Sequence, residues 1–255
     1  MIGSWFHRSW CYVFLISFAC VYYLVNAPLL LGHYDLGWHL AAGDLIRHDA
    51  HIPSQDPWSF TSGGAQWFNL SWSWDVIASV LFQYIGFSGL ILLAVACGAV
   101  IVGYLTSVCL WSGASAGLIA ACALPLIYIQ IDPALGLPEM VSEQDVLYLQ
   151  THFQNARLLN HWNYGGILIF RTRGSIPVFV DGRAATAYPD ALLRDYFKLS
   201  QLDIDETAWD TVREKYKIDT VLWVRAHEQL RRFLVDKRGW KEARTGTYES
   251  IYTKP

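Results

Sequence analysis

The chain has 255 residues, of which 53% are hydrophobic and only 16% are charged, with a net charge of -3 and a mean hydropathy of +0.24. An average soluble domain carries about 25% charged residues, so this composition is atypical of a fully water-soluble protein. The small negative charge offers no electrostatic basis for nucleic-acid binding, and we expect no nucleic-acid partner.

Charged residues are unevenly distributed along the chain. Only two of the 19 Lys and Arg, Arg8 and Arg47, and only five of the 22 Asp and Glu precede Asp132. The distribution predicts a transmembrane region over residues 1–131 and a soluble domain over residues 132–255. All five cysteines lie in apolar runs of the first region, so we expect neither a disulfide nor a thiolate zinc site in the second.

The apolar runs of the first region surround a polar segment at residues 32–74. The uncharged run Ser9–Leu31 would reach about 34 Å as a helix, which predicts a first membrane span. Beyond the polar segment, the pattern predicts an interfacial amphipathic helix at Ser71–Ile85, a second span at Leu90–Trp111 and a third at Ala116–Ile131. We therefore expect about three transmembrane helices plus an interfacial helix, with 32–74 as an outer loop.

The few charges of the first region also predict its orientation. Arg8 and the amino terminus favour a cytoplasmic start, and the acidic loop at 32–74 favours the opposite side. Three spans would then place the loop and the soluble domain together on the outer, periplasm-like face of the membrane. A multi-pass protein with a periplasmic domain is the resulting expectation.

The soluble domain is expected to alternate strands and helices. Ser142 can cap a helix, and Pro189 can open another as its first residue. Two further helices and several strands are predicted: helices around Trp209–Tyr216 and Leu230–Leu234, buried strands at Leu158–Asn160, Ile176–Val180 and Ile218–Val224, and an edge strand at Tyr248–Tyr252. Alternation of this kind predicts a small α/β domain with a largely parallel sheet.

Asp35 is the first candidate for chemistry, because it follows the first predicted span directly. In a helix, Asp35 and His39 would share one face, with Trp38 beside them. A carboxylate at a membrane surface can accept a proton from an attacking hydroxyl or hold a divalent cation. The alternative is that Asp35 only caps the turn after the span.

Other polar residues of the loop have simpler interpretations. His48 and His51 lie near Asp44 and Asp49, but their spacing matches no metal-binding signature, and we expect no metal site. Asp56 precedes a proline and is typical of a turn.

A second constellation lies in the soluble domain, where the run from His161 to Tyr164 precedes the pair Gly165-Gly166 and contains Trp162 and Asn163. An aromatic pair can stack on a sugar, and adjacent glycines allow the backbone to approach a ligand. Asp181 and Arg183, after the next predicted strand, can bind hydroxyls or phosphate. An equally good alternative is that the glycines serve only to make a turn and that Asp181 and Arg183 pair with each other to fix the loop.

Several of these motifs resemble one group of bacterial polytopic membrane proteins that look related to the GT-C glycosyltransferases. The first loop carries DLGWHLAAGDLI at 35–46, IPSQDPWSFT at 52–61 and WFNLSWSW at 67–74, and the carboxyl-terminal part carries NYGGILIFR at 163–171, PVFVDGR at 177–183 and LLRDY at 192–196. Members of that superfamily move sugars from polyprenyl-phosphate carriers and place an acidic residue after their first span, which maps to Asp35. The run from Trp162 to Gly166 is similar to the Trp-Trp-Asp-Tyr-Gly signature of oligosaccharyltransferases, with Asn163 at the acidic position.

The resemblance implies a membrane-embedded hexosyltransferase that uses a polyprenyl-phosphate-sugar, with Asp35 as catalytic residue and a divalent cation as an open question. The substrate-binding residues would be Trp38, His39, Asp56, Trp162, Tyr164, Gly165, Gly166, Asp181 and Arg183. Because only residues 87–131 separate the two regions, a lipid-linked donor would need a second copy or a partner membrane protein to complete its groove. The alternative is a shortened, non-catalytic relative: a membrane-anchored scaffold whose α/β domain binds a partner.

Overall fold

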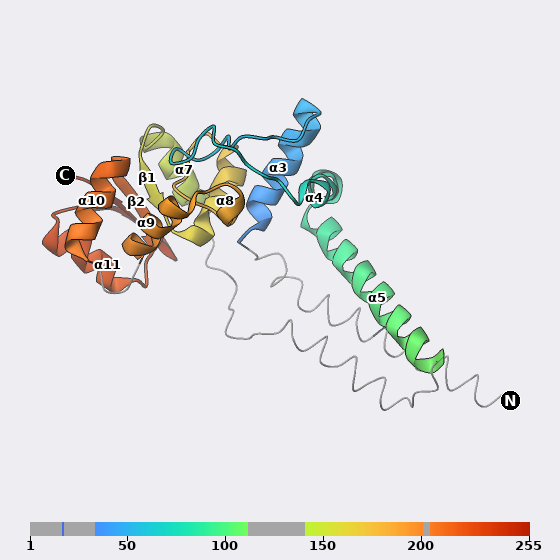
Figure 1. Cartoon of the computed structure of the whole chain (residues 1–255). Helices are drawn as coiled ribbons and strands as arrows, with labels where there is room; N and C mark the ends of the chain where they lie inside the picture. Colours follow the sequence, from blue (N-terminus) through green and yellow to red (C-terminus); the bar gives the residue numbers. More distant parts are fainter. Residues whose placement is uncertain (1–16, 18–33, 112–140, 201–204) are drawn as a thin grey trace. The chain divides into compact units, whose positions relative to one another are not determined.

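The computed structural model describes Ser17 and residues 34–111, 141–200 and 205–255 (Figure 1). These residues fall into two compact units. Leu81–Trp111 belongs to the first unit, and the second unit combines Tyr34–Val80 with the described residues from Val141 to Pro255. The polar segment that was expected to be a loop of the membrane region is therefore part of the same unit as the carboxyl-terminal residues.

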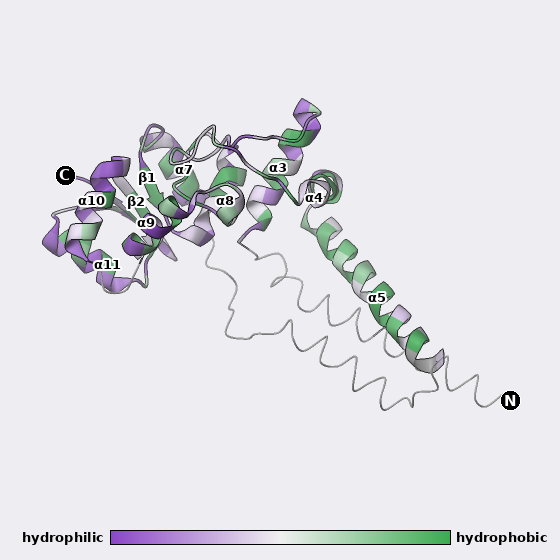
Figure 2. Ribbon diagram, viewed as in Figure 1, coloured by the Kyte–Doolittle hydropathy of each residue, from purple (hydrophilic) through white to green (hydrophobic). Residues whose placement is uncertain are grey.

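The first unit contains helix α5, Phe87–Trp111, which is mostly hydrophobic (Figure 2). Its stretch Phe87–Val108 has a mean hydropathy of 2.3 and is long enough to cross a membrane. Within the described ranges it is the one helix that meets this condition. The expected fold of about three transmembrane helices followed by a separate soluble domain is therefore wrong. Apart from Ser17, the other two expected spans, Ser9–Leu31 and Ala116–Ile131, lie outside the described residues.

Helix α4, Trp72–Ile85, forms where an interfacial helix was predicted, and its polarity is reversed relative to a soluble helix. Asp75 and Ser79 are buried, whereas the side chains of Trp72 and Ile77 are 47% and 50% exposed. Burial of the polar side follows from its contact with helix α3, Leu36–Asp49, where a methyl group on Gly43 would overlap the backbone of Asp75. An apolar side exposed to the surroundings is typical of a helix that contacts lipid.

The sheet of the second unit has four strands in the order β1-β2-β4-β3: Leu158–Asn160, Thr220–Val224, Glu249–Thr253 and Lys241–Thr245. β1 and β2 pair in parallel, with Leu159 opposite Val221. β4 is antiparallel to both β2 and β3. The prediction of a largely parallel sheet is wrong, because the chain returns through a β3–β4 hairpin rather than through a helical crossover.

Two strand predictions fail for identifiable reasons. β4 lies inside the sheet rather than at its edge, because β3 pairs with its outer side. β3 was not predicted, since its sequence is mostly charged and lacks apolar alternation. Ile176–Val180 is buried but is not a sheet strand, since the Asn160 side chain accepts from Phe179 N at 2.7 Å and donates to Val180 O at 2.8 Å. Its Val178 instead forms an isolated bridge with Ser59.

The remaining helices surround the sheet and start at caps that the sequence supplies. Ser142 accepts from Asp145 N, His161 from Asn163 N, and Asp205 from Thr207 N. The elements are α7 (Glu143–His152), α8 (Trp162–Thr172), η1 (Ala184–Thr186), α9 (Asp190–Ser200), α10 (Glu206–Tyr216), α11 (Glu228–Arg232) and the π-helical η2 (Phe233–Lys237). Helix α8 contradicts the predicted turn at Gly165-Gly166.

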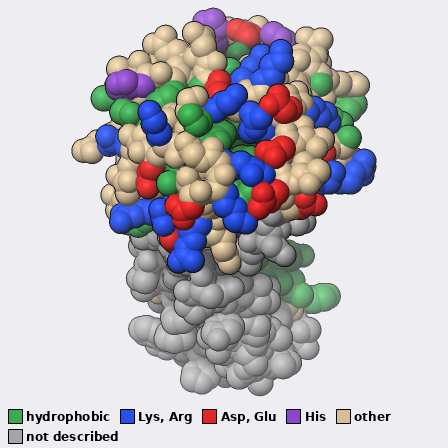
Figure 3. All heavy atoms as spheres, turned by 90° about the vertical axis from the view of Figure 1, so that its left-hand side faces the viewer, with side chains coloured by type: hydrophobic (Ala, Val, Ile, Leu, Met, Phe, Trp, Pro, Cys, Tyr) green, Lys and Arg blue, Asp and Glu red, His purple; other side chains and the backbone are tan. Residues whose placement is uncertain are grey.

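Basic and acidic side chains are mixed on the face of the second unit that Figure 3 shows. Arg231 pairs with Glu228 at 2.8 Å, and Arg238 pairs with Asp210 at 3.0 Å. Exposed pairs of this kind contribute little to stability, and they leave no extended patch of one sign on this face.

Candidate functional site

Asp35 lies at the start of α3, where that helix contacts α8. Gly37 and Gly166 allow the contact, because a methyl group on Gly37 would overlap the backbone carbonyl of Gly166. A methyl group on Gly166 would in turn lie 2.7 Å from the carbonyl oxygen of Tyr34. The two glycines are therefore packing residues that bring the two backbones together.

The Asp35 carboxylate is half-buried against the segment that contains Asp181. A methyl group on Gly182 would overlap the Asp35 carboxylate and would lie 3.2 Å from Nε1 of Trp38. Asp35 is the residue before α3 and makes no side-chain capping hydrogen bond to that helix. Nε1 of Trp38 is buried and has no hydrogen-bond partner within the described part of the chain.

His39, one turn after Asp35, is held by a buried carboxylate of α4. Nδ1 of His39 lies 2.5 Å from Oδ1 of Asp75, whose side chain is fully buried. Asn69 donates to the other oxygen of Asp75 at 2.8 Å, and the Trp38 ring stacks on the His39 ring at 3.6 Å. His39 is thus held in orientation by the Asp75 carboxylate and by the stacked Trp38 ring.

Arg183 is the centre of a buried polar network. Its Nη1 donates to Asp56 at 2.7 Å, while its Nε and Nη2 donate to the two oxygens of Asp181 at 2.8 and 2.7 Å. The side chains of all three residues are 0% exposed. The Tyr188 hydroxyl adds a bond to Asp181 at 2.5 Å. Burial disfavours the charge on Arg183, but Asp181, Tyr188 and Asp56 outweigh burial and raise its pKa.

Aromatic rings and backbone hydrogen bonds complete this network. The guanidinium carbon of Arg183 lies 4.9 Å from the ring centres of both Trp58 and Trp67. Phe68 N donates to Thr186 O at 3.1 Å, which joins the same two segments through the backbone. Arg183 therefore ties the polar segment at 52–68 to the carboxyl-terminal part of the unit.

The aromatic and glycine residues of the predicted second constellation lie on the first turns of α8. Tyr164 is 1% exposed and belongs to the core. A methyl group on Gly165 would overlap the carbonyl of Val180, so this glycine admits the segment before Asp181. His161, Trp162 and Asn163 of this constellation line a described pocket.

That pocket has a volume of about 550 Å³ and opens at the carboxyl ends of the parallel strands β1 and β2. Ligands of α/β proteins commonly bind at this edge. The described lining residues are His161, Trp162, Asn163, Tyr196, Phe197, Ser200, Trp223, Val224, Ala226 and His227. The sequence reasoning included His161, Trp162 and Asn163 and missed the others. For His227, the available signal was its position soon after the apolar strand β2.

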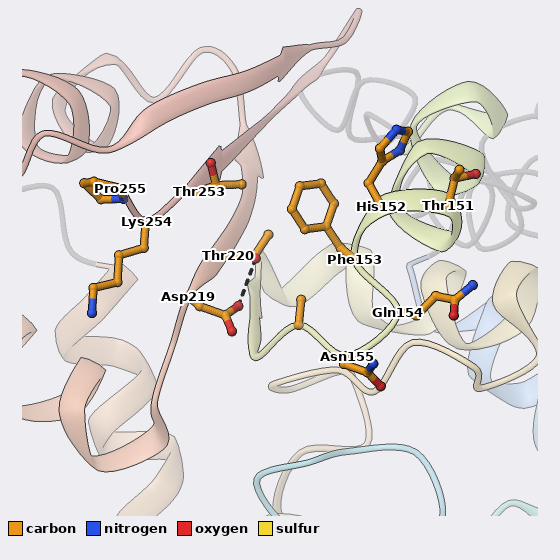
Figure 4. Close-up of a pocket in the computed structure, with 11 residues that line it drawn as sticks. Thr151, His152, Phe153, Gln154, Asn155, Asp219, Thr220, Thr253, Lys254 and Pro255 are labelled. Atoms are coloured by element: carbon orange, nitrogen blue, oxygen red, sulfur yellow. Dashed lines mark hydrogen bonds between the residues drawn. The ribbon is translucent and has the colours of Figure 1, made fainter.

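A second pocket, of about 660 Å³, lies at the opposite edge of the sheet (Figure 4). Phe153, Asp219 and Lys254 are among its lining residues. Asp219 uses its side chain to hold Thr220 at 2.9 Å and the Arg157 backbone at 3.0 Å. The Asp219 carboxylate thus already accepts two hydrogen bonds from the protein. The pocket also lies where the parallel strands begin, not at the carboxyl ends where ligands commonly bind.

A third pocket, of about 690 Å³, adjoins a buried carboxyl pair at the start of α7. Hydrogen bonds from Ser142 and Arg244 lower the pKa of Asp145 although burial opposes them. Burial and the neighbouring Asp145 raise the pKa of Glu249 to about 7. Glu249 also accepts from Ser142 N at 2.6 Å, so the pair joins β4 to α7.

The donor groups at Asp35 do not fit a divalent cation. Within the described residues, no group of three His, Cys, Asp or Glu side chains gathers closely enough to hold a metal ion. Among the described residues, the Gly182 backbone and the Trp38 indole lie beside the Asp35 carboxylate, and neither is a typical metal ligand. His48 instead pairs with Asp49 at 2.7 Å on an exposed surface.

Comparison with protein-family models, curated proteins and solved structures finds no match to this chain. The relationship to GT-C glycosyltransferases therefore rests on the sequence motifs, and it stays a prediction.

Proposed function

We propose that this chain is a membrane-anchored, GT-C-like glycosyltransferase in which Asp35 is the general base. The supporting observation is the position of the Asp35 carboxylate, which is half-buried against Gly182 although 146 positions separate the two residues. The two regions that carry the resemblance thus meet at the one acidic residue that it singles out. Trp38 adds a buried N–H donor close to the same point.

In the proposed reaction, an acceptor hydroxyl attacks the anomeric carbon of a polyprenyl-phosphate-sugar. The new glycosidic bond forms as the bond from the anomeric carbon to the phosphate oxygen breaks, and polyprenyl phosphate leaves. Asp35 takes the proton of the hydroxyl. His39, fixed by Asp75, keeps the same face of α3 ordered. The step is written without a metal ion, since the described residues around Asp35 do not form a ligand set.

Membrane association is supported by α5 and by the exposed apolar side of α4. A single residue, Gly86, separates the two helices in the chain. We place the second unit on the periplasmic face of a bacterial inner membrane, where polyprenyl-phosphate-sugars are used. A second copy or a partner membrane protein would complete the groove for the lipid chain.

The test compares Asp35→Asn with Asp44→Asn in the full chain. Asp44 is on the same helix, its side chain is 79% exposed, and its closest basic partner is Arg47 at 3.8 Å. Membranes that contain each variant would be incubated with radiolabelled undecaprenyl-phosphate hexoses, and release of undecaprenyl phosphate would be followed. Asp35→Asn should reduce transfer at least about a hundredfold, as expected for loss of a general base, and Asp44→Asn should not. Equal transfer by both variants would refute the role of Asp35.

A membrane-anchored scaffold is the second candidate, and one observation favours it. Asp56, Asp181 and Arg183 were predicted to bind substrate, yet their side chains are fully buried and bonded to one another. For a scaffold, the wild type and Asp35→Asn would be equally inactive with every hexose donor while both remained folded in the membrane.

A further inference from the structure

The pocket at the carboxyl ends of β1 and β2 has aromatic walls. The rings of Trp162 and Phe197 are nearly parallel, at 16° with centres 6.1 Å apart, and Phe197 is 53% exposed. Trp223 forms another part of the wall and is buried. Two nearly parallel aromatic rings, one of them largely exposed, provide a flat apolar surface on which a ring-shaped ligand can stack.

Two imidazoles supply polar contacts in the same pocket. Burial and the neighbouring His227 lower the pKa of His161 to about 4, and burial also lowers the pKa of His227. Both rings are therefore neutral at pH 7. Their protonation can be assigned from their partners, because a neutral imidazole has one donor and one acceptor nitrogen.

In each ring, the Nδ1 atom is the acceptor. Nδ1 of His161 accepts from Asn163 N at 3.3 Å, and Nδ1 of His227 accepts from Nε1 of Trp223 at 2.9 Å. The hydrogen of each ring is therefore on Nε2. Nε2 of His227 is buried and has no hydrogen-bond partner among the described residues. A buried donor without a partner is costly, and a ligand oxygen would satisfy it.

The lining also excludes some ligands. No Asp, Glu, Lys or Arg is among the described residues that line the pocket. Among these described residues, an anion such as phosphate finds no counter-charge, and a cation finds no carboxylate. Asn163 and Ser200 add an amide and a hydroxyl, which can both donate to and accept from a ligand.

We propose that this pocket binds a neutral pyranose ring, with one face of the sugar on Phe197 and a hydroxyl oxygen accepting from Nε2 of His227. A pyranose has apolar C–H faces for the aromatic wall and hydroxyls around its edge for the imidazole, amide and hydroxyl groups. A volume of about 550 Å³ is within the usual range for small-ligand sites and accommodates one or two such rings. The site contains neither Asp35 nor Gly182, so it does not depend on the proposed catalytic role of Asp35.

The experiment is a binding titration with the full chain in lipid nanodiscs prepared without sugar-based detergents. The probes are methyl glucopyranoside, methyl galactopyranoside and N-acetylglucosamine, with adenosine and inorganic phosphate for comparison. Saturation-transfer NMR reports which probe protons contact the protein. We expect at least one pyranoside to bind with a Kd below about 10 mM and with transfer to its ring C–H protons, and phosphate not to bind.

Variants locate the binding. Phe197→Ala should weaken pyranoside binding about tenfold at little cost to folding, because the side chain is largely exposed. His227→Phe keeps a ring but removes the donor, and it should weaken binding about fivefold or more. Tyr248→Ala removes another exposed aromatic, 48% exposed and outside the pocket lining, and should have no effect.

Three results would overturn the proposal: no pyranoside binding, tighter binding of adenosine than of every pyranoside, or equal loss with Phe197→Ala and Tyr248→Ala. Asp35→Asn should bind pyranosides like the wild type. A failure of this proposal and a failure of the Asp35 mechanism are thereby distinguishable.

Discussion

Replacing Arg183 by Met should destabilise the second unit strongly. The substitution leaves Asp56 and Asp181 without their shared counter-charge although both side chains are 0% exposed. Removing one partner of a buried ion pair costs about 3–5 kcal/mol, because an uncompensated charge remains in the interior. Typical domains have an unfolding free energy of about 5–15 kcal/mol, so the loss would be a large fraction of the total.

The assay is denaturant unfolding of the full chain in detergent micelles, followed by tryptophan fluorescence, since Trp58 and Trp67 lie against Arg183. Arg232→Met is the matched control, because its side chain is 69% exposed and pairs only with Glu228; it should change the unfolding free energy by less than about 1 kcal/mol. Adding Asp56→Asn to Arg183→Met should restore part of the loss by removing one uncompensated charge. A loss below about 1 kcal/mol for Arg183→Met, or no restoration, would refute the electrostatic account.

Three further outcomes are expected. Gly37→Ala should lower the unfolding free energy by about 1–3 kcal/mol, because the added methyl group overlaps the Gly166 carbonyl. Asp44→Ala, on the exposed side of α3, is the control. Equal effects of the two substitutions would contradict the close contact between α3 and α8. Glu249 has a pKa of about 7 in the folded protein, against an ordinary value of 4.5, so its neutral form stabilises the fold fully below pH 4.5 and this stabilisation is lost as pH rises through 7. At pH 8 the unfolding free energy of Glu249→Gln should therefore exceed that of the wild type by about 3 kcal/mol. Equal values at pH 8 would show that Glu249 is not held neutral. His161 has a pKa of about 4 in the folded protein, against an ordinary value of 6.5, so between these values the unfolded chain binds a proton that the folded chain does not. The unfolding free energy should therefore fall by about 3 kcal/mol as pH drops from 6.5 to 4. His161→Asn keeps a cap for α8 and should lack this decrease; the same decrease in the variant would contradict the lowered pKa of His161.

Local signals in the sequence predicted several elements correctly. Ser142 caps α7, Pro189 directly precedes α9, and the apolar run at Leu90–Trp111 lies within α5. Each of these depends on a cap, a proline or a composition that acts within a few residues of the chain. The sequence was therefore informative where the cause was local.

The errors arose where distant contacts decided the outcome. Gly165 and Gly166 look like a turn, but they form part of a helix because α3 and the backbone at Val180 approach them closely. Ile176–Val180 has the composition of a strand, yet the amide of Asn160 takes its hydrogen bonds. A single sequence does not contain these pairings.

For the candidate site, the sequence identified residues better than roles. Asp181 and Arg183 do pair, as one of the two open alternatives stated, and Asp56 joins them from a segment that composition had assigned to the membrane region. His227 and Phe197 were missed, because they become neighbours of Trp162 only when β1 and β2 lie side by side.

The contact between Asp56 and Arg183 also has a consequence for biosynthesis. The ribosome makes Asp56 127 residues before Arg183. At about 5–20 residues per second, the earlier segment must wait about 6–25 s before its partner is synthesised. During that interval Trp58 and Trp67 have no guanidinium between them, and the nascent chain exposes two indoles beside an unpaired carboxylate. Translation rate and chaperone protection of this segment should therefore influence the yield of correctly assembled protein.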